Sequence, residues 1–172
     1  MASTLTVDTI QGATTAANVK LPSGGVVGQK TVAAATSTQF NTNTYTLVTG
    51  MEIAYAPKFS TSKLMFMIQC HMFFGQYQNA WASVSMRLRN TTDGANLHTD
   101  IGYGTGKWSS DASDREMAYL HLLTEYAPGA TSSKTYQLQV AKIQGSGAGS
   151  GFDANNQNYG GGGRITILEI AQ

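Results

Sequence analysis

The sequence predicts an all-β protein in which several short strands form a sandwich or a barrel. Apolar residues recur with a period of two along most of the chain, which is the period of a half-buried strand. Turn-forming residues separate these segments at short intervals. No segment carries a convincing helical pattern. Hydrophobic residues make up 41% of the 172 residues, which is enough for a globular core.

Two segments show the alternation most clearly. Residues 80–89 alternate apolar with polar side chains, and residues 135–143 do the same. Each predicts a strand with one face toward the core and one toward solvent. The inward side chains expected from this pattern are Ala82, Val84, Met86, Leu88, Tyr136, Leu138 and Val140. Further strands are predicted at residues 26–32, 45–54, 117–126 and 164–171, with turns at Pro57, Asp93-Gly94, Pro128-Gly129 and residues 145–163.

The most apolar segment, residues 63–74, carries apolar side chains on both faces. One face holds Leu64, Phe66, Ile68, Cys70, Met72 and Phe74, and the other holds Met65, Met67 and Phe73. In an antiparallel sandwich, one of these faces packs on the opposing sheet. The second face needs cover from an overlying loop or from a partner subunit, and we expect the partner subunit.

The charge composition also favours assembly. Only 12% of the residues are charged and the net charge is +1, whereas charged residues make up roughly 25% of an average protein. No basic block is present, so we expect no nucleic-acid partner. A surface of neutral polar groups either tolerates changes of salt and pH or is covered by identical copies.

Cysteine usage and the absence of targeting signals suggest where the protein folds. The single cysteine, Cys70, lies in the apolar segment and cannot form an internal disulfide. We expect a buried thiol in a protein that folds in a reducing cytoplasm. The chain lacks the basic start of a secretory signal, and no apolar stretch approaches the about 20 residues of a membrane-spanning helix. We therefore expect no membrane insertion and release by cell lysis.

Residues 1–28 differ from the rest of the chain. They contain short extended patterns but too few large apolar residues to fold alone, so we expect them to become ordered by docking onto another surface. This organisation predicts an N-terminal arm at residues 1–28 and a head domain at residues 29–172. The apolar side chains available for docking are Leu5, Val7, Ile10, Val19 and Leu21.

Several segments resemble a known group of virion proteins. Residues 3–24 are similar to the N-terminal segment of tail-fibre and head-fibre proteins of tailed phages, particularly marine ones. The chain from Thr46 is similar to their C-terminal domain. The segments that carry this likeness are residues 49–53, 57–63, 134–139 and 165–172. The resemblance implies an all-β jelly-roll sandwich of the tumour-necrosis-factor type that works as a homotrimer.

The resemblance also implies a function and a location. It suggests a short trimeric tail fibre that attaches the virion to the host surface, with the arm docked on a tail adaptor or nozzle protein. The alternative is a capsid decoration or head-fibre protein without receptor binding. Longer fibres of this group carry a shaft between arm and head, which this chain almost lacks. The resemblance carries over no catalytic residue and no cofactor.

The residues themselves give little sign of catalysis or metal binding. His71 and His121 fall in predicted strands and His98 in a predicted loop near Asp100, so they do not form the tight constellation of a metal site. Residues 104–107 lack the spacing and the helix of a phosphate-binding loop and indicate a glycine-rich turn. The acidic residues Asp111, Asp114 and Glu116 share one predicted loop, which leaves a glycan-cleaving enzyme as a minority interpretation.

Two loops combine aromatic side chains with amides. Aromatic rings stack on sugars and amides bond their hydroxyls, so such loops suit carbohydrate recognition at the exposed end of a sandwich. The simpler interpretation is a flexible connector without a ligand. The residues that we expect to contact a host-surface glycan are Tyr77, Trp81, Asn155, Asn156 and Tyr159.

Overall fold

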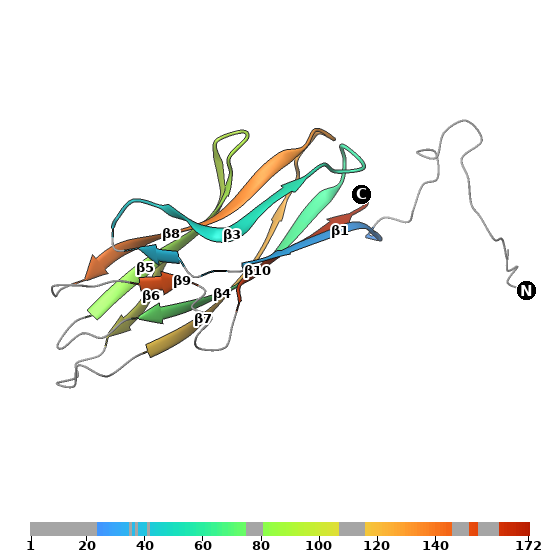
Figure 1. Cartoon of the computed structure of the whole chain (residues 1–172). Helices are drawn as coiled ribbons and strands as arrows, with labels where there is room; N and C mark the ends of the chain where they lie inside the picture. Colours follow the sequence, from blue (N-terminus) through green and yellow to red (C-terminus); the bar gives the residue numbers. More distant parts are fainter. Residues whose placement is uncertain are drawn as a thin grey trace, which may run out of the picture.

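The computed structural model is an all-β sandwich of two antiparallel sheets (Figure 1). It describes residues 24–34, 36, 38–40, 42–74, 81–106, 116–145, 152–154 and 162–172. Within these residues every regular element is a strand, as the period-two pattern predicted. None of the described residues belongs to a helix that could cross a membrane.

The two sheets differ in size. The six-stranded sheet runs in the order β1 (Val26–Ala33), β10 (Arg164–Ile170), β4 (Lys63–Phe74), with β7 (Glu116–Tyr126) on the other side of β4. The short strands β9 (Phe152–Ala154) and β2 (Thr38–Phe40) extend it beside the end of β4. The four-stranded sheet runs β3 (Thr46–Tyr55), β8 (Lys134–Gly145), β5 (Trp81–Asn90), β6 (Ala95–Gly106).

The strand pairing is that of a jelly roll. Strand β5 pairs with β6, β4 with β7, β3 with β8 and β1 with β10, so the four pairs are nested like one long hairpin. The hairpin is rolled up, because β10 also pairs with β4 and β8 with β5. Such rolling produces two packed sheets from one hairpin. The predicted all-β sandwich is therefore confirmed.

The core lies between the sheets and is built from the predicted inward faces. On β4, Leu64, Phe66, Ile68 and Cys70 are buried. Strands β5, β8 and β10 contribute Val84, Met86, Leu88, Tyr136, Leu138, Val140, Ile165 and Ile167. Phe66 meets Tyr136 edge to face, with ring centroids 4.9 Å apart. This arrangement is the favourable one for two aromatic rings.

Some details differ from the sequence prediction. His98 belongs to strand β6 rather than to a loop, and residues 104–106 extend that strand instead of forming a turn. Ser85 is buried although its neighbours predict an outward position. The Tyr45 hydroxyl lies 2.7 Å from the Ser85 Oγ, so the Tyr45 side chain covers this outward position.

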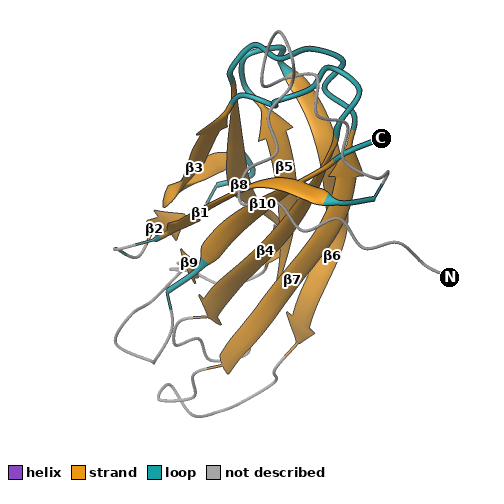
Figure 2. Ribbon diagram, turned by 90° about the vertical axis from the view of Figure 1, so that its right-hand side faces the viewer, coloured by secondary structure: helices purple, strands orange, loops and turns teal. Residues whose placement is uncertain are grey.

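The two ends of the sandwich carry different segments. At one end, Val26 pairs with Ile170 and Ile170 with Lys63, and the described loops gather near the C-terminus (Figure 2). Strand β1 includes residues 26–28, which were predicted as the last part of the arm, and it begins at this end. At the opposite end, the residue pairs that terminate the strands are Phe74 with Glu116, Trp81 with Gly106 and Ala82 with Gly145.

Candidate functional site

The outer face of the six-stranded sheet is the surface that differs most from an ordinary solvated face. Register across β1, β10, β4 and β7 aligns its side chains in three rows. We name each row after its residue on β4. The Met65 row is Gln29, Leu168, Met65 and Glu125; the Met67 row is Thr31, Thr166, Met67 and Leu123; the Gln69 row is Ala33, Arg164, Gln69 and His121.

The centre of this face is apolar and open to solvent. Met67 is 46% exposed and Leu123 is 65% exposed, and the two are direct register partners on β4 and β7. Met65 and Leu168 beside them are half-buried. Among the described residues, one other large apolar side chain is exposed. It is Val26, which is 57% exposed and also lies in this sheet. The second apolar face predicted for residues 63–74 is thus present for Met65 and Met67.

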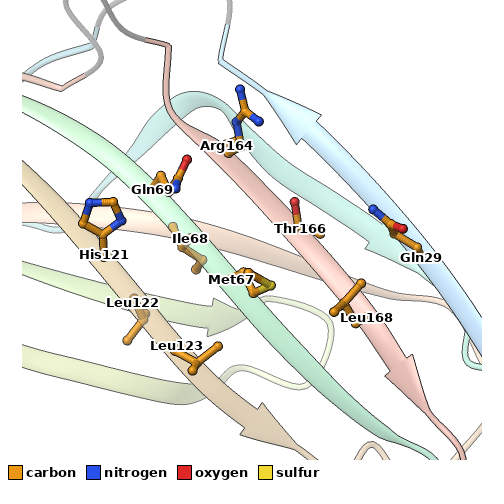
Figure 3. A pocket seen from close by; sticks show the side chains of 10 residues that line it. All are labelled: Gln29, Met67, Ile68, Gln69, His121, Leu122, Leu123, Arg164, Thr166 and Leu168. Carbon is orange, nitrogen blue, oxygen red and sulfur yellow. The ribbon is translucent and has the colours of Figure 1, made fainter. Parts of the chain in front are cut away.

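A groove follows these rows across the sheet. It has a volume of about 550 Å³ and is lined by side chains of β1, β10, β4 and β7. Figure 3 shows Met67, Leu168 and Leu123 in the lower part of the groove, with Arg164, Gln69 and His121 above them. The groove therefore has an apolar part and a polar part.

The polar part is the Gln69 row. Arg164, Gln69 and His121 stand on three neighbouring strands and are all exposed. Within the part of the chain that the structure describes, none of these three side chains forms a hydrogen bond or an ion pair. Their donors therefore point to solvent from a common row.

The opposite end of the face carries one ion pair. The Lys63 ammonium lies 3.4 Å from Glu125 Oε2, and both side chains are about half exposed. A pair of this kind contributes at most about 1 kcal/mol. Lys63 therefore neutralises the charge of Glu125 in the Met65 row. The Gln69 row has the guanidinium of Arg164 and no carboxylate.

A buried carboxylate lies on the inner side of the same sheet, and the sequence analysis did not single it out. Glu169 of β10 is fully buried. Its Oε2 accepts a hydrogen bond from the Tyr55 hydroxyl at 2.8 Å, and its Oε1 accepts from the backbone amides of Lys58 at 2.7 Å and Phe59 at 3.2 Å. Three donors satisfy the carboxylate, which a buried charge requires. The residue holds the loop after β3 against the last strand.

The surroundings of Glu169 are tightly packed. Burial, together with the hydrogen bond and the charge of Glu169, raises the pKa of the Tyr55 phenol well above its ordinary value. The Lys58 ammonium donates to the Val27 carbonyl on β1. Gly28 leaves room for the Tyr55 hydroxyl group, because a Cβ at position 28 would lie 2.1 Å from its oxygen. The period-two pattern of residues 165, 167 and 169 was the signal that places Glu169 inward.

Most of the residues predicted for glycan binding and for the arm fall outside the described residues. These are Tyr77, Asn155, Asn156 and Tyr159, and Leu5, Val7, Ile10, Val19 and Leu21. Trp81 is the first residue of β5, and its backbone pairs with Gly106. The described strand ends beside the predicted glycan-binding loops lie at the end opposite to the start of β1. Among the described residues, no group of three metal-ligating side chains occurs.

Comparison with known proteins gives similar structures but no match by sequence. No protein-family model matches the chain, and no curated protein matches its sequence. Among solved structures, the chain is similar to the IBDV T13 viral particle, with 13% identity and a TM-score of 0.48 over 84% of this chain and 32% of that one. It is similar to the infectious bursal disease virus Gx strain, with 14% identity and a TM-score of 0.43 over 82% and 32%.

The VP2 subviral particle of infectious bursal disease virus is a third neighbour, with 11% identity and a TM-score of 0.42 over 84% of this chain and 32% of that chain. The chain thus spans about a third of the length of these neighbours. Likenesses of this size carry no argument about function.

Proposed function

We propose that this chain is a structural, non-enzymatic virion protein, a short trimeric phage tail fibre that attaches the particle to the host surface. The observation that carries the proposal is the exposed apolar centre of the outer face, formed by Met67 and Leu123. Exposed apolar patches of this kind are typical of surfaces that bind another protein. The resemblance of the sequence to trimeric fibre proteins favours two further copies of the same chain as the partners.

The described residues that flank the two predicted segments lie at opposite ends of the head, which supports attachment. The arm leaves the head beside the C-terminus, where the Gly24 amide donates to the Ala171 carbonyl at 2.8 Å and the Ala171 amide donates to Gly25 at 2.9 Å. The strands that lead to the predicted glycan-binding loops end on the far side of the head. A subunit docked through its arm would direct these loops away from the particle. Three weak sites per trimer, and many trimers per particle, would then give firm adsorption.

Self-association is tested with a variant that keeps the size of the apolar side chains but removes their hydrophobic character. The double substitution Met67→Gln with Leu123→Gln should weaken the trimer at least roughly tenfold, because each side chain loses apolar area buried between copies. Sedimentation across a concentration series measures the change. The matched control is Thr49→Gln with Thr99→Gln, since both threonines are exposed on the four-stranded sheet. A monomeric wild-type protein at micromolar concentration contradicts the proposal.

The location on the particle is tested by imaging. Particles labelled with a binder against the head should show a small fixed number of labels around the tail axis. Labels repeated over the whole shell would instead establish the capsid-decoration alternative. Release of soluble sugar from host polysaccharide by the purified protein would contradict a purely structural role.

A further inference from the structure

The polar row of the outer face has a chemistry that self-association does not use. Arg164, Gln69 and His121 are consecutive in one ladder row, on β10, β4 and β7. Neighbouring strands are about 4.8 Å apart, so the three side chains cover a strip of roughly 10 Å. The Arg164 side chain is long enough to bend over Gln69 and meet a group that His121 reaches from the other side. Figure 3 shows the three residues together at one end of the groove.

The donors in this row outnumber the acceptors. A guanidinium has five N–H donors and no acceptor, an amide has two donors and an imidazole has at least one. The row contains no carboxylate, because its fourth member is Ala33. Within the three rows, the acidic residue is Glu125, which lies four residues from His121 along β7, about 13 Å away in an extended strand, and pairs with Lys63.

The Met67 row strengthens the hydrogen bonds that these donors can form. Met67 and Leu123 lie directly beside Gln69 and His121 along their strands and keep part of the groove free of polar groups. Hydrogen bonds to a charged group gain strength where apolar side chains displace water. A ligand in the groove would therefore meet charged and amide donors at one end and an apolar surface at the other.

We propose that the Gln69 row is an oxyanion-binding site, which takes a sulfate, a phosphate or the carboxylate of an acidic sugar. Arg164 supplies the charge and a forked pair of donors, as guanidinium groups do for oxyanions. Gln69 and His121 donate from β4 and β7. In a copy whose Met67 and Leu123 are not covered by another copy, the uncharged part of a larger ligand lies on these two side chains. The site is complete in one copy of the chain, so the proposal does not depend on the trimer.

The experiment is a calorimetric titration with sodium sulfate at an ionic strength held constant with sodium chloride. We expect saturable binding of one sulfate per chain. Arg164→Gln should weaken it at least roughly tenfold, since a charge-assisted pair of hydrogen bonds is lost. His121→Gln keeps a donor and should have a smaller effect. The control Arg89→Gln removes the same charge from β5 in the other sheet, where Arg89 donates to Asn96, and should bind as the wild type does.

The source of the oxyanion is distinguished in a second titration. Glucuronate is compared with glucose, its neutral counterpart, and with sulfate. Tighter binding of glucuronate than of sulfate points to an acidic sugar that uses the apolar part of the groove, whereas the reverse order points to an inorganic ion. Binding of glucose that equals binding of glucuronate would overturn the proposal, because the charge would then have no role.

A third set of titrations tests the oxyanion site independently of the proposed trimer. The same titrations are repeated on Met67→Gln with Leu123→Gln, in which the groove is open whether or not the wild type associates. Absence of saturable sulfate binding in both the wild type and this variant, or equal binding after Arg164→Gln, overturns the oxyanion site. A monomeric wild type that binds sulfate through Arg164 would leave the site standing and refute the trimer alone.

Discussion

The Tyr55 hydroxyl donates a hydrogen bond of 2.8 Å to the buried carboxylate of Glu169. This contact joins the end of β3 to the last strand of the chain, and the same carboxylate also accepts from the backbone amides of Lys58 and Phe59. The segments around Tyr55 and Glu169 are 114 residues apart in sequence. One side chain thus connects the two sheets at the end where β1 begins.

Replacement of Glu169 should therefore be strongly destabilising. Glu169→Leu leaves the buried Tyr55 hydroxyl and two part-buried backbone amides without an acceptor, and we expect the free energy of unfolding to fall by about 3 to 5 kcal/mol. Glu169→Gln keeps one carbonyl oxygen for the Lys58 and Phe59 amides and should cost roughly half as much. Urea unfolding measures both. Equal stability of Glu169→Leu and the wild type would show that the carboxylate is not needed to hold the loop.

Gly28 and Tyr55 should be energetically coupled. A Cβ at position 28 would lie 2.1 Å from the Tyr55 hydroxyl oxygen and 3.0 Å from Glu169 Oε2. We expect Gly28→Ala to cost about 2 kcal/mol or more through this overlap, and Tyr55→Phe to cost about 1 kcal/mol through the lost hydrogen bond. The double variant should be more stable than the sum of the two effects predicts, because Tyr55→Phe removes the atom that overlaps.

A double-mutant cycle measures this coupling. Additive effects would mean that the strand moves to accommodate the added methyl group without contact with Tyr55. The cycle also checks the register of β1 on β10, since only this register places Gly28 beside Glu169.

Tyr136 should make the fold sensitive to alkali. Its hydroxyl is buried and has no hydrogen-bond partner within the described structure, and burial raises the pKa of this phenol well above its ordinary value of 10.0. The folded protein holds the phenolic proton more tightly than the unfolded chain does. Its contribution to stability is therefore complete below about pH 10 and is lost as the pH rises further, by up to about 1.4 kcal/mol per pH unit.

Tyr136→Phe tests this sensitivity. At neutral pH the variant should be at least as stable as the wild type, because an unpartnered buried hydroxyl is removed while the contact with the Phe66 ring stays. Above pH 10 its stability should fall less steeply. Tyr55 remains in the variant and also has a raised pKa, so part of the fall persists until Tyr55→Phe is added. Identical alkaline profiles would contradict the assignment.

The strands that the sequence predicts well are those with one clear apolar face. Residues 63–74 agree with β4 at both ends. Strand β6 was missed in the stretch from Ala95 to Gly106 because its large apolar residues, Leu97, Ile101 and Tyr103, are interrupted by Thr99 and separated by polar residues and glycine. Strands β2 and β9 have three residues each, too few to establish a period.

The candidate site was only half predictable. The pattern of residues 63–74 predicts the exposed Met67, but not that Leu123 and Arg164 stand beside it. Those positions depend on which strands pair and in which register, and a period-two pattern contains neither. Glu169 shows the opposite case. Its inward position follows from the alternation with Ile165 and Ile167, yet hydrophobicity alone would not place a carboxylate in a core.

Deletion of residues 2–23 should leave the head folded. The head makes its own core from β1 to β10, and the pairing of Gly24 with Ala171 begins after the deleted segment. We expect an unchanged thermal midpoint and loss of incorporation into particles, because the proposed docking side chains are gone. Normal incorporation of the deleted form would show that attachment uses another surface.

Deletion of residues 164–172 should have the opposite effect. Strand β10 lies between β1 and β4 in the six-stranded sheet, so its loss removes the partner of both strands. It also removes the buried side chains of Ile165, Ile167 and Glu169. Full burial of each isoleucine contributes roughly 1.5 to 3 kcal/mol. Together with the lost hydrogen bonds, this is comparable to the whole stability of a domain, which is about 5 to 15 kcal/mol.

We expect the truncated protein to be insoluble or unfolded, measured by its soluble fraction and by circular dichroism. A shorter deletion serves as the control. Removal of Gln172 alone takes away an exposed residue beyond β10 and should leave the fold intact. If the protein without residues 164–172 were soluble and folded, β1 would have to pair directly with β4, which would contradict the nested strand order on which the jelly roll is built.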